Sequence, residues 1–150
     1  MRTKGAIEIE IEVEGAITSR VRGKLQEIGK MAAEELGAAG RVLRIIVLPR
    51  AELKRIKKEF FPFQSSCDDV LSFGEEEQGD FPHPEYSLRP AGEVYLSREI
   101  LSENKERAFR LLVHGILHLF GYHHTEKRDI LMMQKKEQEL WERILSSGLM

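Results

Sequence analysis

The histidines of this chain are concentrated in one short segment, HGILHLFGYHH, which holds four of the five. His114 and His118 are four residues apart, so on a helix they lie about 40° apart around the axis and one turn apart along it. Gly121 tolerates the left-handed conformation, so the chain can turn there and return His124 to the same side. The segment therefore predicts a metal site with His114, His118 and His124 as ligands.

The spacing favours a catalytic zinc site over a structural one. The pattern H-x3-H-x2-G-x2-H has the histidine and glycine spacing of metzincin zinc sites. Three protein ligands leave a fourth position for water, whose pKa zinc lowers towards about 7. The single cysteine cannot build a thiolate cage. We therefore expect one Zn²⁺ per chain. For a histidine pair without a third histidine, the simpler interpretation would be two residues that line the wall of a pocket or lie near the surface.

Two further residues of the segment have open roles. Neighbouring side chains diverge, so His123 is expected beside the site, as a proton carrier or a solvent-facing residue. Gly115 stands where metalloproteases carry the glutamate that acts as general base, which argues against peptide hydrolysis by that mechanism. Either a strand packs closely against Gly115 or substrate passes there, and the sequence leaves both readings open.

The apolar spacing predicts the elements that position these residues. Strict alternation indicates a strand over 7–13, and a mostly apolar, β-branched run indicates a central strand over 41–49. Two further short strands are expected over 68–73 and 92–97, with a polar Gly- and Pro-rich loop over 74–92 between them. Spacings of three and four indicate helices over 16–36 and 51–60, and over Ser102 to Phe120 with Glu103 and Glu106 in its first turns. A last helix, capped by Thr125, is expected to turn five apolar residues inward: Ile130, Met133, Leu140, Trp141 and Ile144. We expect an α+β fold in one domain over 1–150, with a small mixed sheet of about four strands and the metal site on a buried central helix.

Composition limits the partners and the compartment. The 23 basic and 25 acidic residues give a net charge of −2, so any nucleic-acid site must be a local patch. One cysteine suits a reducing compartment, and no apolar run reaches the roughly 20 residues that cross a bilayer. We expect a soluble cytoplasmic protein without a membrane partner.

Three motifs resemble those of the YbeY family of bacterial rRNA-maturation endoribonucleases. The family signature H-G-x-L-H-L-x-G-Y-D-H is matched from His114 to His124, except that His123 replaces its aspartate. The family's T-D-V-L-S-F is similar to Asp68–Phe73, with Asp68 in place of threonine, and its G-D-I-x-I-S is similar to Gly92–Ser97. The motifs occur in the family's order, and the resemblance spans most of the chain.

The resemblance implies a function as well as a fold. It implies an α+β fold, zinc on His114, His118 and His124, and cleavage of single-stranded RNA. It also implies a role in rRNA maturation and ribosome quality control, with the ribosome or its small subunit as partner.

One departure concerns substrate binding. The family usually carries an arginine shortly before its second motif, where Phe61 or Pro62 stands here. The nearest cations, Lys54, Arg55, Lys57 and Lys58, would supply phosphate contacts instead, although an ordinary solvated helix face is the simpler reading of each. We take Arg55, Lys58 and Ser72 as candidate substrate contacts, the alternative for Ser72 being a hydrogen bond to backbone.

These observations favour a metal-dependent, single-strand-specific endoribonuclease. The alternatives are a zinc hydrolase of peptides or amides and a ribosome-associated metal-binding factor with little catalysis. The missing arginine keeps the last alternative open. The sequence does not identify a general base: Asp69, His123 and Glu126 are candidates by proximity, and the attacking oxygen is either water or the 2′-hydroxyl of RNA.

Overall fold

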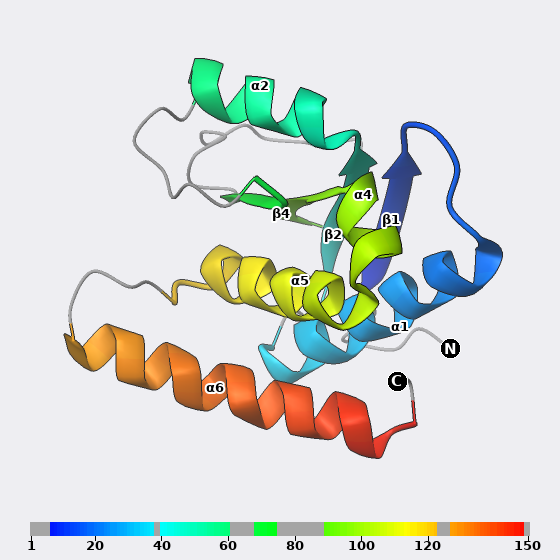
Figure 1. Ribbon diagram of the computed structural model, residues 1–150. Helices are drawn as coiled ribbons and strands as arrows, with labels where there is room; N and C mark the ends of the chain where they lie inside the picture. The colour runs from blue at the N-terminus through cyan, green and yellow to red at the C-terminus, as the bar shows by residue number, and fades with distance from the viewer. Residues whose placement is uncertain (1–6, 38–39, 61–67, 75–88, 123–126, 149–150) are drawn as a thin grey trace.

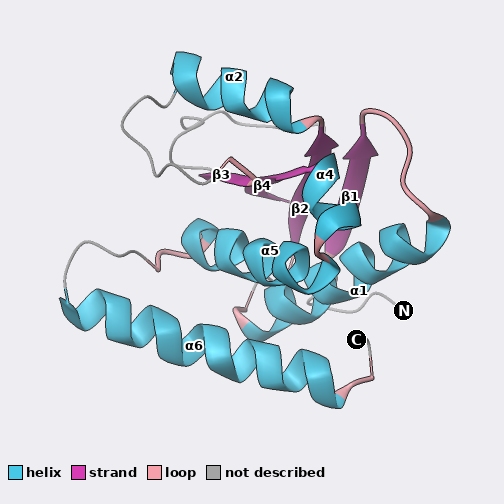
Figure 2. Cartoon of the chain, viewed as in Figure 1, coloured by secondary structure: helices cyan, strands magenta, loops and turns pink. Residues whose placement is uncertain are grey.

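A four-stranded mixed sheet is the centre of the computed structural model, which describes residues 7–37, 40–60, 68–74, 89–122 and 127–148. The strands occur in the order β1 (Glu8–Val13), β2 (Arg41–Leu48), β4 (Arg89–Ser97) and β3 (Val70–Gly74). The first three are parallel, and β3 runs antiparallel to β4 (Figure 2). The predicted α+β fold with about four mixed strands is confirmed.

Helices cover both faces of this sheet. They are α1 (Ser19–Glu35), α2 (Arg50–Phe60), α4 (Arg98–Glu103), α5 (Lys105–Leu119) and α6 (Lys127–Ser146). In Figure 1, α2 lies on one side of the sheet, and α1, α5 and α6 lie on the other. Helix α5 contacts β3, β4, α1 and α6, and Phe109, Leu112, Val113 and Ile116 on it are fully buried. The histidine segment therefore begins on the central helix of the fold.

The helix predicted from Ser102 to Phe120 is wrong at its start. The structure has two helices, because Asn104 adopts an extended conformation with φ −157° and ψ 92°. Its side-chain oxygen accepts a hydrogen bond of 3.1 Å from the backbone N–H of Arg107, which caps α5. Asparagine competes in this way with the helical backbone, so it ends one helix and starts the next. Glu106 lies in the first turn of α5 as expected, whereas Glu103 ends α4.

Two smaller expectations are also corrected. Ile130 is 36% exposed rather than inward-facing, because the first turns of α6 extend beyond the end of α5 (Figure 1). The other four apolar residues predicted to face inward from α6 are buried: Met133, Leu140, Trp141 and Ile144. The loop predicted over 74–92 is shorter at both ends, because Gly74 belongs to β3 and Arg89–Gly92 belong to β4. Thr125, the predicted cap of α6, lies outside the described residues.

Candidate functional site

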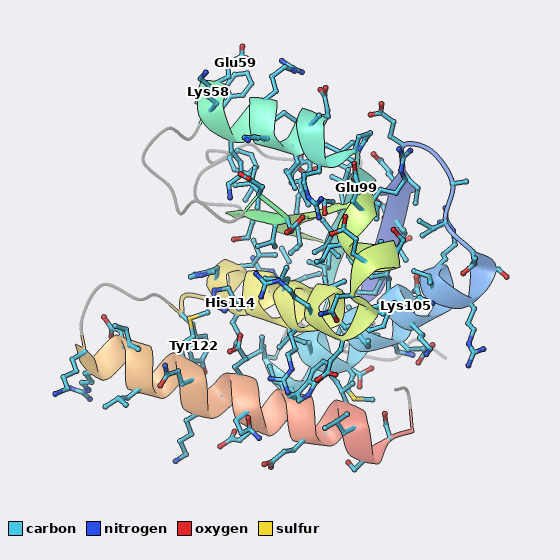
Figure 3. The ribbon with its side chains drawn as sticks, in the orientation of Figure 1. Lys58, Glu59, Glu99, Lys105, His114 and Tyr122 are labelled. Atoms are coloured by element: carbon cyan, nitrogen blue, oxygen red, sulfur yellow. The ribbon has the colours of Figure 1, made fainter. Side chains whose placement is uncertain are left out.

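His114 and His118 converge on one side of α5. Their Nε2 atoms are 3.2 Å apart, and their rings lie 4.8 Å apart between centroids at an interplanar angle of 82°. Both side chains are half-buried (Figure 3 labels His114). The predicted convergence of this pair is confirmed. His124 and His123 lie outside the described residues, so the proposed third ligand stays a prediction.

Hydrogen bonds fix which nitrogen of each ring carries the proton. His114 Nδ1 lies 2.8 Å from Oε1 of Glu137, and His118 Nδ1 lies 2.8 Å from the carbonyl oxygen of Tyr122. Carboxylate and carbonyl oxygens accept, so each Nδ1 donates and carries the proton. In the neutral rings both Nε2 atoms then present lone pairs, which repel each other unless a proton or a metal cation lies between them.

The separation of the two Nε2 atoms suits metal binding. Two nitrogens bound to one tetrahedral zinc ion at its usual bond length lie about 3.3 Å apart. The observed 3.2 Å is close to this value. An acceptor on the distal nitrogen of each imidazole is also the usual way in which proteins orient metal-binding histidines. The donor set and its hydrogen-bond partners therefore fit a zinc ion.

The turn after α5 orients His118. Gly121 has φ +92°, its N–H donates to the carbonyl of His118, and the N–H of Tyr122 donates to the carbonyl of Leu117. These two bonds form a Schellman motif, in which a glycine takes the left-handed position. The turn predicted at Gly121 is confirmed, and it brings the carbonyl of Tyr122 onto Nδ1 of His118.

Glu137 is not among the site residues predicted from the sequence, although its position in α6 indicates a partner. Glu137 is four residues after Met133 and four before Trp141, and both of these are buried. A carboxylate on the apolar stripe of a helix needs a partner, because burying an unpaired charge is costly. Here the partner is His114.

We expect substitution of Glu137 to weaken zinc binding. Glu137→Ala removes the acceptor that orients His114 and should reduce zinc affinity by about 10–100-fold, while Glu137→Gln keeps an oxygen acceptor and should lose less. The affinity is measured by competition with a chromogenic zinc chelator. Glu139→Gln makes the same change at an exposed position of α6 and serves as control. Unaltered zinc affinity in both Glu137 variants would contradict the assigned role.

Gly115 faces the sheet at a point where no side chain fits. A Cβ built on it would lie 2.9 Å from Cγ1 of Val94 and 3.5 Å from Cγ2 of Val70. Of the two readings left open by the sequence, close packing against a strand is therefore correct. Gly115 is buried, so substrate does not pass over it. A glutamate at this position would meet β4, so the position is unsuited to a peptidase base.

The candidate substrate contacts divide between the two faces of the sheet. Ser72 is paired with Val94 on β4, so both side chains point to the α5 side, where Ser72 is half-buried. Arg55 and Lys58 are on α2, across the sheet from His114 (Figure 3). Arg55 forms ion pairs with Glu52 and Glu59 of its own helix, and Lys58 is exposed.

The two other candidate cations of α2, Lys54 and Lys57, lie close to partners in the structure. Lys57 is buried and donates a 3.1 Å hydrogen bond to the carbonyl of Val70, which makes its role structural. Nζ of Lys54 lies 4.0 Å from Oδ2 of Asp68. Phe61 and Pro62, which replace the family's arginine, lie outside the described residues.

Asp69 is bonded to α2 and β4 rather than acting as a free base. Its Oδ1 accepts hydrogen bonds from Ser97 Oγ at 2.6 Å and Arg50 Nε at 2.7 Å, and Arg50 also forms a bidentate pair with Glu103. Burial opposes ionisation of Asp69, but the hydrogen bonds from Ser97 and Arg50 outweigh it and lower its pKa. A carboxylate with a lowered pKa is a weak general base at neutral pH.

Replacing Asp69 by asparagine should lower stability in a pH-dependent way. The folded pKa of Asp69 is below its ordinary 3.8, so its contribution is complete above that pH and is lost as the pH falls through the folded pKa. Asp69→Asn should therefore lower the free energy of unfolding by about 1–2 kcal/mol at pH 7. The difference from the unsubstituted protein should shrink below about pH 4. Thermal unfolding from pH 7 to pH 3 measures this, with the half-exposed Asp68→Asn as control; a constant difference at all pH values would contradict it.

Among the described residues, none of the helices combines the length and the low charge needed to cross a bilayer.

Comparison with known proteins gives a consistent set of relatives. The family model described as Endoribonuclease YbeY matches residues 7–145. An Endoribonuclease YbeY from Exiguobacterium sibiricum is 31% identical over 142 residues, which is 85% of this chain and 89% of that protein. One from Leptospira biflexa is 40% identical over 80 residues, so this match covers 47% of the chain and about half, 49%, of the relative.

The comparison with solved structures also gives a match. The solution structure of TM1509 from Thermotoga maritima has a TM-score of 0.47 at 24% identity, covering 94% of each chain. The family match over 7–145 and the relative from Exiguobacterium sibiricum decide the assignment. The chain belongs to the YbeY family.

Proposed function

We propose that this protein is a metal-dependent endoribonuclease that cleaves single-stranded RNA. The observation that carries the proposal is the pair of imidazoles whose Nε2 atoms face each other at 3.2 Å while both Nδ1 atoms are held by acceptors. Membership of a family described as Endoribonuclease YbeY supports RNA as the substrate. We further propose that one domain over 1–150 carries this activity.

Zinc is the cofactor that we propose, with His114, His118 and His124 as its ligands. His124 follows Gly121 at a distance that allows its return to the pair. When bound by these residues, zinc would be a Lewis acid that stabilises negative charge on the phosphoryl oxygens. The hydrogen bonds to Glu137 and to the carbonyl of Tyr122 keep the two imidazoles in the ligating tautomer.

The group that attacks the phosphorus atom is either the 2′-hydroxyl of the RNA or a water molecule. Asp69 is held by Arg50 and Ser97, so it is a poor base, and we propose no general base among the described residues. Attack by the 2′-hydroxyl leaves a 2′,3′-cyclic phosphate, whereas attack by water leaves a linear phosphate. End-group analysis of the cleaved RNA separates the two.

We propose rRNA as the substrate, with the ribosome or its small subunit as partner and the cytoplasm as compartment. The net charge of −2 supports a local contact surface over general attraction to RNA. Ser72 lies on the histidine side of the sheet and remains a proposed substrate contact. Arg55 and Lys58 remain proposed contacts for RNA that passes around the β3 edge onto α2.

Two observations bear on the alternative functions. A peptidase would need a base from another position, because Gly115 is packed against Val94. A metal-binding factor with little catalysis would have the same histidine geometry, so only an activity measurement separates it from the nuclease.

The test of the proposal is a comparison of three polymers. Zinc-loaded protein is incubated with single-stranded RNA, duplex RNA and casein, beside a His114→Ala variant prepared in the same way. We expect cleavage of the single strand alone, and none by the variant. Cleavage that survives in His114→Ala would reveal a contaminant, and tight zinc binding without cleavage of any polymer would favour the metal-binding factor.

A further inference from the structure

A groove leads along α5 to His114. Its volume is about 510 Å³, and it is lined by Asn104, Glu106, Arg107, Arg110, Leu111, His114 and Glu137. All of these residues except Glu137 belong to α5 or cap it, and Glu137 comes from α6. The groove therefore extends from the N-terminus of α5 to His114, one of the two proposed ligands on this helix.

Arg107 and Arg110 lie on the same stripe of α5 as His114. Seven residues separate Arg107 from His114, which is close to two turns, so the two side chains leave the helix about 20° apart around its axis and roughly 10 Å apart along it. Arg110 is one turn before His114. The groove thus presents cations in line with the atoms that would hold the metal.

Arg107 is the cation of the groove that is most available to bind an anionic ligand. Arg110 lies over the ring of Trp141 at 4.6 Å and its Nε is 3.5 Å from Glu106. The carboxylate of Glu137 is engaged by His114. Arg107 is exposed and forms no ion pair with the residues that the structure describes, although its charge contributes to the lowered pKa of Asp69. A guanidinium of this kind suits bidentate binding of a phosphate.

We propose that Arg107 binds a phosphate of the RNA strand next to the one that is cleaved, with the strand lying in the groove along α5. This proposal rests on the proposed nuclease function and adds a path for its substrate. It locates a phosphate contact on the histidine side of the sheet, whereas α2, with its cations, lies on the other side (Figure 1). Because the chain as a whole is not basic, a local contact of this kind contributes a large share of the free energy of RNA binding.

The proposal predicts a loss of affinity that depends on salt. Initial rates of cleavage of a labelled single-stranded RNA by zinc-loaded protein, at several NaCl concentrations, give KM and kcat. Arg107→Gln should raise KM several-fold at low salt, and the slope of log KM against log salt should fall by about 0.7, the contribution of one phosphate contact in a single strand. Zinc affinity and kcat at saturating RNA should change less than about two-fold.

Two variants make the result specific. Arg107→Lys retains the charge and should keep the salt slope, with a smaller rise in KM because the bidentate contact is lost. Arg20→Gln removes the same charge from an exposed position on α1 and should leave KM and the slope unchanged.

The outcomes separate this inference from the function on which it rests. If KM and the salt slope are unchanged in Arg107→Gln, or change equally in Arg20→Gln, the proposed phosphate contact is wrong. The proposed nuclease function still holds in that case if the unsubstituted protein cleaves RNA. Failure of the unsubstituted protein to cleave RNA would overturn both.

Discussion

Replacing His118 by alanine should abolish both zinc retention and RNA cleavage while the protein stays folded. His118 supplies one of two Nε2 atoms that face each other at 3.2 Å, so its loss leaves His114 without the geometry that binds a metal. Loss of an orienting partner alone weakens metal binding by about 10–100-fold, and loss of a ligand should exceed this. Zinc content after gel filtration and the zinc dissociation constant from calorimetry measure the effect.

A comparison with His118→Gln strengthens that prediction. The glutamine side chain preserves polarity at a half-buried position but does not reproduce the imidazole nitrogen. Both variants should therefore lose zinc, with circular dichroism spectra like that of the unsubstituted protein. Retention of one zinc per chain with unchanged affinity in either folded variant would show that His118 is not a ligand.

Replacing Gly115 by alanine should destabilise the protein, against the usual preference of helices for alanine. The new Cβ would lie 2.9 Å from Cγ1 of Val94, and Val94 is fully buried, so one of them has to move. Overpacking of a core costs about 1–3 kcal/mol, which exceeds the gain in helix propensity of up to about 1 kcal/mol. We expect the Tm to fall by several degrees, at about 2–4 °C per kcal/mol.

A control and a double variant test the cause of this effect. Gly23 lies within α1, and a Cβ added to it would meet no described atom within 4 Å, so Gly23→Ala should raise the stability. Val94→Ala creates space, so in the Gly115→Ala background it should destabilise less than it does alone, with a coupling of about 0.5–3 kcal/mol. A stabilising Gly115→Ala substitution, or additive effects in the double variant, would contradict close packing as the reason for this glycine.

The parts of the site that the sequence predicts are those determined by local spacing. His114 and His118 meet because they are one turn apart on a helix, and Gly121 turns the chain because glycine accepts its positive φ. The same holds for β1, whose strict alternation of aliphatic and glutamate residues predicts a strand. These patterns need no knowledge of the rest of the fold.

The parts that the sequence does not predict depend on contacts between distant elements. Glu137 is 23 residues from His114 and reaches it because α6 packs along α5. The bond of Arg50 to Asp69 joins α2 to the start of β3, and it removes a candidate base that proximity had suggested. Ile130 follows the apolar period of α6 but is exposed, because the helix extends past its neighbour. The break at Asn104 was missed because a capping asparagine and an ordinary helical asparagine look alike in one sequence.

The central claim is that zinc held by the histidine pair and His124 drives the cleavage of single-stranded RNA. It is tested most directly by stripping the protein with a chelator, returning zinc stepwise and measuring the initial rate of RNA cleavage at each step. We expect no cleavage by the stripped protein, a rate that rises in proportion to added zinc, and a plateau at one equivalent per chain. Full cleavage by the stripped protein, or a rate that does not follow zinc occupancy, would contradict the claim.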